Sequence, residues 1–315
     1  MSRSFLGLQE SRVQPVALSE IRDCGVSLAI KREDELHPVI SGNKYRKLAY
    51  NLEEAARLQQ TTLLTFGGAY SNHIAAVAGA GATFGFKTIG LIRGDELAAD
   101  PVGLSKSNPT LAFASEQGMT CRFVSRSVYR QKTSRQFISG LRKELGDFYL
   151  VPEGGTNRLA VKGCEEILSE ADAQYGVICA AVGTGGTLSG IINSLQPGQR
   201  ALGFPALKGD FLTAEIQSYV QTTDNWCLQT GYHFGGFAKI SKELVTFINA
   251  FKQETGIPLD PVYTGKMMFG LVDLIKKGAF AKGTRILAIH TGGLQGIAGM
   301  NLRLAKKNGP LIHIE

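Results

Sequence analysis

The sequence predicts an α/β protein built as two three-layer α/β domains with mostly parallel sheets. Strand-like apolar runs alternate with helix-like patterns along most of the 315 residues, which is typical of parallel sheets with helices on both faces. The 38 glycines gather between apolar runs, as they do in tight strand-to-helix turns. With 43% hydrophobic and 19% charged residues, the chain is long enough for one large or two medium domains.

The first half of the chain shows this alternation clearly. Short apolar runs predict strands at 26–30, 63–66, 88–92, 120–124 and 148–151. Apolar residues at helical spacing predict a helix that starts near Lys44, a small-residue helix at 74–82, and helices at 110–117 and 134–145.

A turn-rich break at 152–157 precedes a second series of elements. We expect helices at 159–168, from 187 through 191, at 242–254 and at 266–276, and strands at 177–182, 201–205, 227–230 and 286–290. We predict a large domain formed by 1–48 and 158–315, and a smaller domain, 49–157, that closes over the cleft between them.

Composition narrows the functional classes. No apolar run is long enough to span a membrane, and residues 1–8 lack the sustained apolar region of a signal peptide. The five cysteines are scattered without a Cys-x-x-Cys pair, so we expect no metal site, no disulfide framework and a cytoplasmic location. The net charge is +7, but no recognition motif accompanies the basic stretch 122–143, so we expect no nucleic-acid or membrane partner.

Lys44 stands at the expected start of a helix. Ser41 and Asn43 are residue types that cap helix N-termini, and Gly42 permits an unusual backbone angle. The positive end of the helix dipole disfavours an ammonium group there, and burial would lower the lysine pKa further. A partly neutral lysine is a nucleophile suited to Schiff-base chemistry. Position alone nevertheless favours an ordinary solvated lysine.

Gly183-Thr184-Gly185-Gly186-Thr187 lies between an apolar strand and a helix. Backbone N–H groups that converge in such a loop, together with the helix dipole, favour an anion. A dinucleotide fingerprint would need Gly or Ala where Leu188 stands, and a Walker loop would need Lys where Ile191 stands. The loop therefore predicts a monophosphate site, with a purely structural glycine turn as the alternative.

A monophosphate site and a lysine at a helix N-terminus together suggest pyridoxal 5′-phosphate. This cofactor needs a Schiff-base lysine, a phosphate cradle, and partners for its ring hydroxyl and pyridine nitrogen.

Five segments, in order along the chain, resemble the D-cysteine desulfhydrase and 1-aminocyclopropane-1-carboxylate deaminase family. They are Ser41-Gly42-Asn43-Lys44-Tyr45-Arg46-Lys47-Leu48, Tyr70-Ser71-Asn72-His73, Gly183 to Thr187, Asp260-Pro261-Val262-Tyr263-Thr264-Gly265-Lys266, and His290-Thr291-Gly292-Gly293. The family consists of pyridoxal-phosphate enzymes of the tryptophan-synthase-like fold (fold type II), so the resemblance implies this fold, this cofactor and a homodimer.

The resemblance also implies roles for single residues. Lys44 would hold the cofactor as a Schiff base, and Asn72 would hydrogen-bond its ring hydroxyl. Gly183, Thr184, Gly185, Gly186 and Thr187 would cradle the phosphate. Ser71 would contact the substrate carboxylate or help to move a proton, and Tyr263 would lie near the substrate α-carbon. Without the resemblance, a helix cap and a core aromatic would be the preferred interpretations of Ser71 and Tyr263.

The same resemblance adds substrate-binding residues. His73, with Ser71 and Asn72, belongs to the segment expected at the substrate. Tyr232 corresponds to a second site tyrosine, although its surroundings depart from the family.

The family divides at the pyridine nitrogen. In the cyclopropane deaminases a glutamate follows the site tyrosine and leucine follows the histidine, whereas this chain has Thr264 and Thr291 there. A threonine hydroxyl, which we assign to Thr291, supports a neutral pyridine that suffices for elimination of a good leaving group such as thiolate. The chain departs from both branches at Tyr70, where the family usually has Gln, and at Ile74-Ala75-Ala76, which lacks the usual Arg-Gln.

We therefore expect a pyridoxal-phosphate lyase that acts on a small amino acid. The leading hypothesis is a D-cysteine desulfhydrase that forms pyruvate, sulfide and ammonia, with either Lys44 or Tyr263 moving the α-proton. The alternative within the family is a 1-aminocyclopropane-1-carboxylate deaminase. The alternatives of another class are a nicotinamide-dependent oxidoreductase and a non-catalytic phosphate-ligand binding module.

Overall fold

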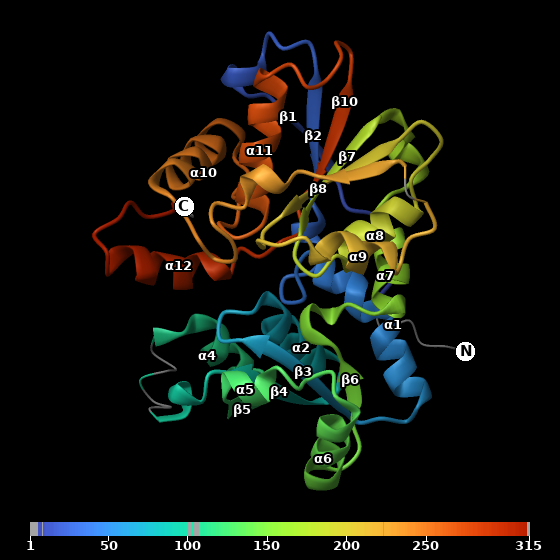
Figure 1. The fold of residues 1–315 in the computed structure, drawn as a ribbon, viewed down its shortest axis with the longest axis vertical. Coiled ribbons are helices and arrows are strands. Elements are labelled where there is room, and N and C mark those ends of the chain that lie inside the picture. Colours follow the sequence, from blue (N-terminus) through green and yellow to red (C-terminus); the bar gives the residue numbers. More distant parts are fainter. Residues whose placement is uncertain (1–5, 8, 100–102, 104–106, 223, 314–315) are drawn as a thin grey trace.

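A computed structural model describes residues 6–7, 9–99, 103, 107–222 and 224–313. It contains two sheets, which lie in the upper and lower halves of Figure 1. The predicted α/β class with mostly parallel sheets is confirmed.

The larger sheet has six strands in the order β1-β2-β10-β7-β8-β9. Its strands are β1 (Val13–Val16), β2 (Ser27–Lys31), β7 (Val177–Val182), β8 (Arg200–Pro205), β9 (Trp226–Leu228) and β10 (Arg285–Ile289). β1 is antiparallel to β2, and every other neighbouring pair is parallel. The first and last segments of the chain thus share one sheet, in which β2 pairs with β10 from Ser27 opposite Arg285 onward.

The smaller sheet has four parallel strands in the order β5-β4-β3-β6. Its strands are β3 (Thr62–Gly68), β4 (Lys87–Arg93), β5 (Thr120–Val124) and β6 (Tyr149–Val151).

Helices cover both faces of each sheet. They are α1 (Asn43–Arg57), α2 (Asn72–Phe84), α4 (Pro109–Glu116), α5 (Arg126–Tyr129), α6 (Arg135–Leu145), α7 (Arg158–Glu165), α8 (Gly186–Asn193), α9 (Phe211–Gln217), α10 (Lys242–Thr255), α11 (Thr264–Lys276) and α12 (Gly296–Ala305). Short 3-10 helices lie at Ser19–Ile21, Glu33–Glu35, Asp95–Ala99, Glu153–Gly155, Glu170–Gln174 and Thr230–Tyr232.

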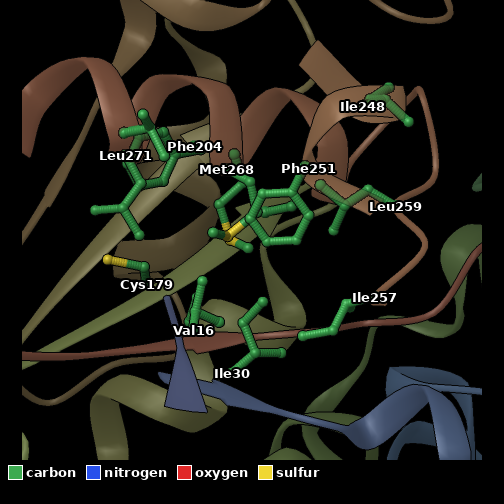
Figure 2. Close-up of a cluster of buried hydrophobic side chains, with 14 of the residues drawn as sticks. Val16, Ile30, Cys179, Phe204, Ile248, Phe251, Ile257, Leu259, Met268 and Leu271 are labelled. Atoms are coloured by element: carbon green, nitrogen blue, oxygen red, sulfur yellow. The ribbon is translucent and has the colours of Figure 1, made fainter. Parts of the chain in front are cut away.

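The hydrophobic cores explain why the strands read as continuous apolar runs. Helices α10 and α11 pack on one face of the larger sheet around Phe204, Phe251 and Met268 (Figure 2), and α7, α8 and α9 cover the other face. The central strands of such a sheet are buried on both sides, and all six residues of β7 are buried.

Four strands and helices were not predicted, and their sequences explain why. Helix α5 has only four residues, too few for a helical pattern to show. β1 contains Pro15, a residue that normally argues against a strand, and it is accommodated because β1 lies at the edge of the sheet. Helix α12 starts at Gly296 and contains Gly299, which lowers its helix propensity. Helix α9 has only seven residues, with Phe211 exposed at its start.

Two predicted elements end at least two residues earlier than expected. The helix expected at 159–168 ends at Glu165, because a tighter turn follows in which the Ile167 N–H donates to the Cys164 carbonyl. The strand expected at 227–230 is Trp226–Leu228, and Thr230–Tyr232 forms a 3-10 helix instead.

Candidate active site

The turn before α1 rests on the segment that follows β10. Gly42 has a φ of 65°, and a Cβ atom there would lie 2.1 Å from the Thr291 carbonyl oxygen, so only glycine permits this contact. The Asn43 N–H donates to the same oxygen at 3.3 Å. Gly42 occupies the N-cap position without a side-chain cap, so the expected capping by Ser41 or Asn43 is wrong: Ser41 donates to the Asp34 carbonyl instead.

Lys44 is the second residue of α1. Its amine donates to the Asn43 side-chain oxygen at 3.2 Å, and the Asn43 amide donates to the Thr187 hydroxyl at 2.7 Å. Withdrawal from solvent and, second, the nearby charge of Lys47 lower the pKa of Lys44 to about 7. Near neutral pH a large fraction of the amine is therefore uncharged, which is the nucleophilic form.

The loop 183–187 connects β7 to α8 as expected. The first N–H groups of α8 have no partner within the helix, and the helix dipole makes this end favourable for an anion. A Cβ atom on Gly186 would lie 2.8 Å from the Thr156 methyl group and 3.3 Å from the Lys47 amine, and one on Gly185 would lie 3.0 Å from Ile216. The glycines therefore keep this loop closely surrounded by its neighbours.

Lys47 brings a second amine to this loop. It is only 2% exposed, and its Nζ donates to the Thr156 hydroxyl at 2.9 Å and to the Gly154 carbonyl at 3.0 Å. The Thr156 and Thr184 hydroxyls are 2.5 Å apart. Burial lowers the pKa of Lys47 to about 8, so it still carries most of its positive charge at pH 7.

The residues 70–73, at the start of α2, differ in their surroundings. Asn72, the first residue of α2, contacts the segment after β10, since a Cβ on Gly293 would lie 2.8 Å from the Asn72 amide nitrogen. Ser71 caps α2 and accepts from the Ile74 N–H at 3.4 Å. Tyr70 is half exposed and lies on α12, because a Cβ on Gly299 would lie 2.6 Å from its ring.

His73 points into the interior. It is 2% exposed, and its Nε2 lies 2.8 Å from the Thr65 hydroxyl. Burial, helped by the charges of Lys44 and Lys47, holds the His73 pKa well below its usual range, so the ring is neutral. The described lining of the cavity beside Lys44 does not include His73.

The two tyrosines assigned to the site occupy different places. Tyr263 precedes α11, and its ring lies against the phosphate loop, since a Cβ on Gly183 would lie 3.2 Å from it. Burial raises the pKa of Tyr263, so its hydroxyl stays protonated. Tyr232 donates to the Asp273 carboxylate at 2.6 Å and packs on Gly270; the structure does not bring it to the other predicted site residues.

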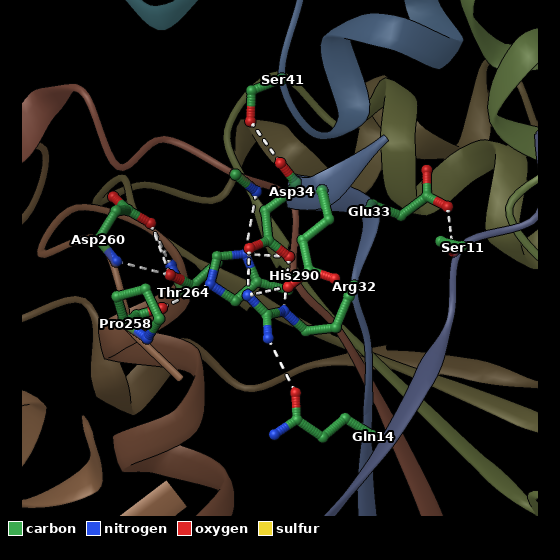
Figure 3. A network of polar contacts seen from close by, with 12 residues as sticks. Ser11, Gln14, Arg32, Glu33, Asp34, Ser41, Pro258, Asp260, Thr264 and His290 are labelled. Carbon is green, nitrogen blue, oxygen red and sulfur yellow. Dashed lines mark hydrogen bonds and ion pairs between the residues drawn. The ribbon is translucent and has the colours of Figure 1, made fainter. Parts of the chain in front are cut away.

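Thr264 and Thr291 differ in what their side chains do. The Thr264 hydroxyl donates to Asp260 at 2.8 Å and accepts from the Asp260 N–H at 2.9 Å (Figure 3). Asp260 also accepts from the N–H groups of 262, 263 and 264. Thr264 is thus committed to the start of α11, whereas Thr291 lies at the cavity beside Lys44.

His290 fixes the segment that carries Thr291. Its Nε2 lies 2.7 Å from the Pro258 carbonyl oxygen, and its Nδ1 lies 3.3 Å from the Asp34 carboxylate (Figure 3). Nδ1 also accepts from the Gly292 N–H at 3.2 Å. The backbone around Thr291 is therefore held from both sides.

A cavity of about 480 Å³ opens beside these residues, and Asn43, Lys44, Asn72 and Thr291 all line it. Among the described residues of its lining, the only carboxylates are those of Asp34 and Glu35. Arg32 binds the Asp34 carboxylate with two hydrogen bonds of 2.9 and 2.7 Å. Glu35 pairs with both Arg12 and Arg32.

Sequence reasoning assigned no role in the site chemistry to Asn43, Lys47 or Thr156. The spacing of Lys47, three residues after Lys44 on one helix, places the two amines on the same face and could have indicated it. No local sequence pattern indicates Thr156, because only the tertiary fold brings it to the loop 183–187.

The chain is similar to known proteins over most of its length. A family model described as "Pyridoxal-phosphate dependent enzyme" matches residues 11–292. The chain is 30% identical over 293 residues to a protein of Pyrococcus horikoshii named "Putative 1-aminocyclopropane-1-carboxylate deaminase", covering 87% of each. It is 31% identical over 302 residues to an Arabidopsis thaliana protein named "Bifunctional D-cysteine desulfhydrase/1-aminocyclopropane-1-carboxylate deaminase, mitochondrial", covering 87% of this chain and 74% of that protein.

A solved structure described as an "ACC deaminase homologue" superimposes with a TM-score of 0.79 at 27% identity and covers 98% of both chains. The tryptophan-synthase-like fold implied by the motifs is thereby confirmed.

Proposed function

Because the chain belongs to the family of pyridoxal-phosphate dependent enzymes, we propose that it is a carbon–sulfur lyase that converts D-cysteine and water into pyruvate, sulfide and ammonia. Membership of this family argues against the two hypotheses of another class, the nicotinamide-dependent oxidoreductase and the non-catalytic binding module.

The residues fit pyridoxal phosphate. The loop 183–187 offers free helix N–H groups, and the Lys47 amine lies where a Cβ on Gly186 would reach. These groups would hold the phosphate, with the hydroxyls of Thr184 and Thr187. Lys44 would hold the cofactor covalently, since its pKa of about 7 leaves it nucleophilic. When bound, the cofactor supplies a conjugated ring that withdraws electrons from the substrate α-carbon.

The pKa values of Lys44 and Tyr263 indicate different roles for the two groups. Lys44, with a pKa of about 7, is neutral often enough near pH 7 to accept the α-proton. Tyr263 has a raised pKa and keeps its proton, so it is a weak acid but can still donate a hydrogen bond. We therefore assign the base to Lys44 and a hydrogen-bond donor to Tyr263. Asn72 would bind the ring hydroxyl, and Ser71 would orient the substrate carboxylate.

One observation supports sulfur elimination over ring opening. The carboxylates in the described lining, those of Asp34 and Glu35, are neutralised by arginine, and the Asp260 oxygens are occupied by the start of α11. The Thr291 hydroxyl is then the group available to the pyridine nitrogen. A hydroxyl does not enforce a protonated ring, and thiolate departs without so strong an electron sink.

The second candidate is a 1-aminocyclopropane-1-carboxylate deaminase. It is supported by the Pyrococcus relative, whose name states this activity, and by the Arabidopsis relative, whose name states both activities.

The test is an assay of the purified holoenzyme with D-cysteine, L-cysteine and 1-aminocyclopropane-1-carboxylate, following sulfide and keto acid. We expect sulfide and pyruvate in equal amounts from D-cysteine. Turnover of the cyclopropane substrate without sulfide from D-cysteine would establish the second candidate instead.

The remaining assignments belong to the same proposal. All five cysteines are free, which suits a reducing cytoplasm. Within the part of the chain that the structure describes, no helix is long and apolar enough to cross a membrane. The homodimer and the domain limits, 1–48 with 158–315 and 49–157, rest on the family resemblance and on the strand pattern.

A further inference from the structure

The cavity beside Lys44 continues well past the residues assigned to the cofactor. Lys44, Asn72 and Thr291 line one end, and none of the residues 183–187 lines it. The other end is formed by Val39 and by Phe113 of α4, because both line the cavity and both pack against Gly79, two turns along α2 from Asn72. The volume of about 480 Å³ lies in the range of pockets that enclose drug-sized ligands; the cofactor ring beside Lys44, Asn72 and Thr291 would share it with the substrate side chain.

The wall of this far end is apolar. Ala75 and Ala76 of α2 line it together with Val39 and Phe113. One turn after Ala75, a Cβ on Gly79 would lie 2.2 Å from Val39 and 3.9 Å from Phe113, so these two side chains pack directly on α2. The short alanine side chains leave the adjoining space open.

The carboxylates and the histidine of the lining are already paired. Asp34 and Glu35 are paired with arginine. The Nδ1 atom of His37 accepts from the N–H groups of Val39 and Ile40 at 3.1 and 3.0 Å, and burial lowers the pKa of its ring. The far end therefore presents no unpaired charge to a substrate group.

We propose that the cavity end formed by Ala75, Ala76, Val39 and Phe113 binds an apolar substituent on the substrate sulfur, so that the preferred substrates are S-alkyl or S-aryl cysteines with a group of about benzyl size. This rests on the proposed function, because the substituent leaves with the sulfur. The carbon–sulfur bond breaks and the sulfur takes its electron pair and a proton. The balanced reaction is thioether amino acid plus water to thiol, pyruvate and ammonium.

The test compares S-benzylcysteine with cysteine on the holoenzyme, using both enantiomers of each. A single methylene in a hydrophobic pocket changes kcat/KM about 10- to 200-fold, so we expect S-benzylcysteine to exceed cysteine by at least about 10-fold. Binding is measured separately by calorimetry with 2-amino-5-phenylpentanoic acid, in which carbon replaces the sulfur and elimination is blocked. We expect it to bind at least about 10-fold more tightly than 2-aminobutyric acid.

Matched variants locate the subsite. Ala75→Leu fills the cavity from a position 5% exposed, and we expect it to lower kcat/KM for S-benzylcysteine by about 10-fold or more, mainly through KM, and to weaken binding of the phenyl analogue alike. Ala82→Leu, on the exposed side of the same helix, should leave both unchanged. Phe113→Ala gives a second readout, because it removes part of the wall without adding volume and should also raise KM for S-benzylcysteine.

The outcomes separate the two proposals. Turnover of D-cysteine with no preference for S-benzylcysteine, and equal binding of the two analogues, would overturn the subsite while the lyase stands. Tight binding of the phenyl analogue that Ala75→Leu abolishes, without elimination from any cysteine derivative, would support the subsite and refute the lyase.

Discussion

The two ends of the site are built differently. At the phosphate loop, Lys47, Thr156 and Thr184 form a closely spaced hydrogen-bonded cluster, and an added Cβ on Gly186 would collide with it. At the far end of the cavity, Ala75 and Phe113 line open apolar space. The first end is shaped for one fixed group, whereas the second can change its occupant through small changes in side-chain volume. Substitutions at the phosphate loop should therefore disrupt cofactor binding, whereas substitutions at the far end of the cavity should change which substrate is preferred.

The largest expected effect comes from removing the nucleophile at the junction of the two ends. Lys44→Ala should abolish the covalent cofactor absorbance and reduce turnover by about 10⁴-fold or more, because base and cofactor link are both lost. Absorbance spectra and sulfide release measure the two losses. Retention of the absorbance band in a folded variant would refute the assignment.

A side chain added to the phosphate loop, 183–187, should weaken cofactor binding without affecting the far end of the cavity. In Gly186→Val the new Cβ would lie 2.8 Å from Thr156, so we expect cofactor affinity to fall about 100-fold as the approach to the loop is blocked. Gly176→Val is the control, since a Cβ there meets nothing within 4 Å. Equal cofactor affinity in the two variants would count against the cradle.

Removing the hydroxyl of Tyr263 tests whether this residue acts as a hydrogen-bond donor in the reaction. Tyr263→Phe keeps the ring on Gly183 and removes only the donor, so kcat should fall about 10²-fold with little change in cofactor affinity. Stopped-flow and steady-state assays separate these quantities. If kcat is intact, Tyr263 acts as a packing surface and Lys44 moves the proton alone.

The smallest effect is a pH dependence of cofactor loading. The neutral amine is the nucleophile, and the pKa of Lys44 is about 7, so the loading rate of apoprotein should rise with pH through about 7 and level off above it. An ordinary lysine, with a pKa near 10.4, would give a rate that still rises at pH 9. Rapid-mixing absorbance at constant ionic strength distinguishes the two profiles.

Features that depend on local sequence patterns could be predicted, whereas contacts between distant segments could not. The parallel sheets, the helix start near Lys44 and the place of the loop 183–187 between a strand and a helix follow from apolar periodicity and glycine placement, which act locally. The Schiff-base role of Lys44 came from the family resemblance. Thr156 and the Thr291 contact with Gly42 depend on segments far apart in the chain, so no local pattern indicates them. The site roles of Ser71, His73 and Tyr232 came from the family resemblance and stay predictions, and Tyr232 bonds Asp273 outside the cavity lining.

The volume of the substrate end could not be predicted either. The Ile74-Ala75-Ala76 segment showed a departure from the family, but alanine is equally a core residue. Only the packing of Val39 and Phe113 on Gly79 shows where space remains.

The most direct test of the central claim is peptide mapping of the holoenzyme after borohydride reduction, which fixes the cofactor on the lysine that holds it. Among the described residues, three lysines have lowered pKa values, Lys44 to about 7 and Lys47 and Lys266 to about 8, so each of them could in principle carry the label. Lys266 donates to the carbonyls of His233 and Gly236, and Lys47 donates to Thr156 and Gly154 beside the phosphate loop. We predict a pyridoxyl label on Lys44; a label on Lys47 or Lys266 would contradict the account.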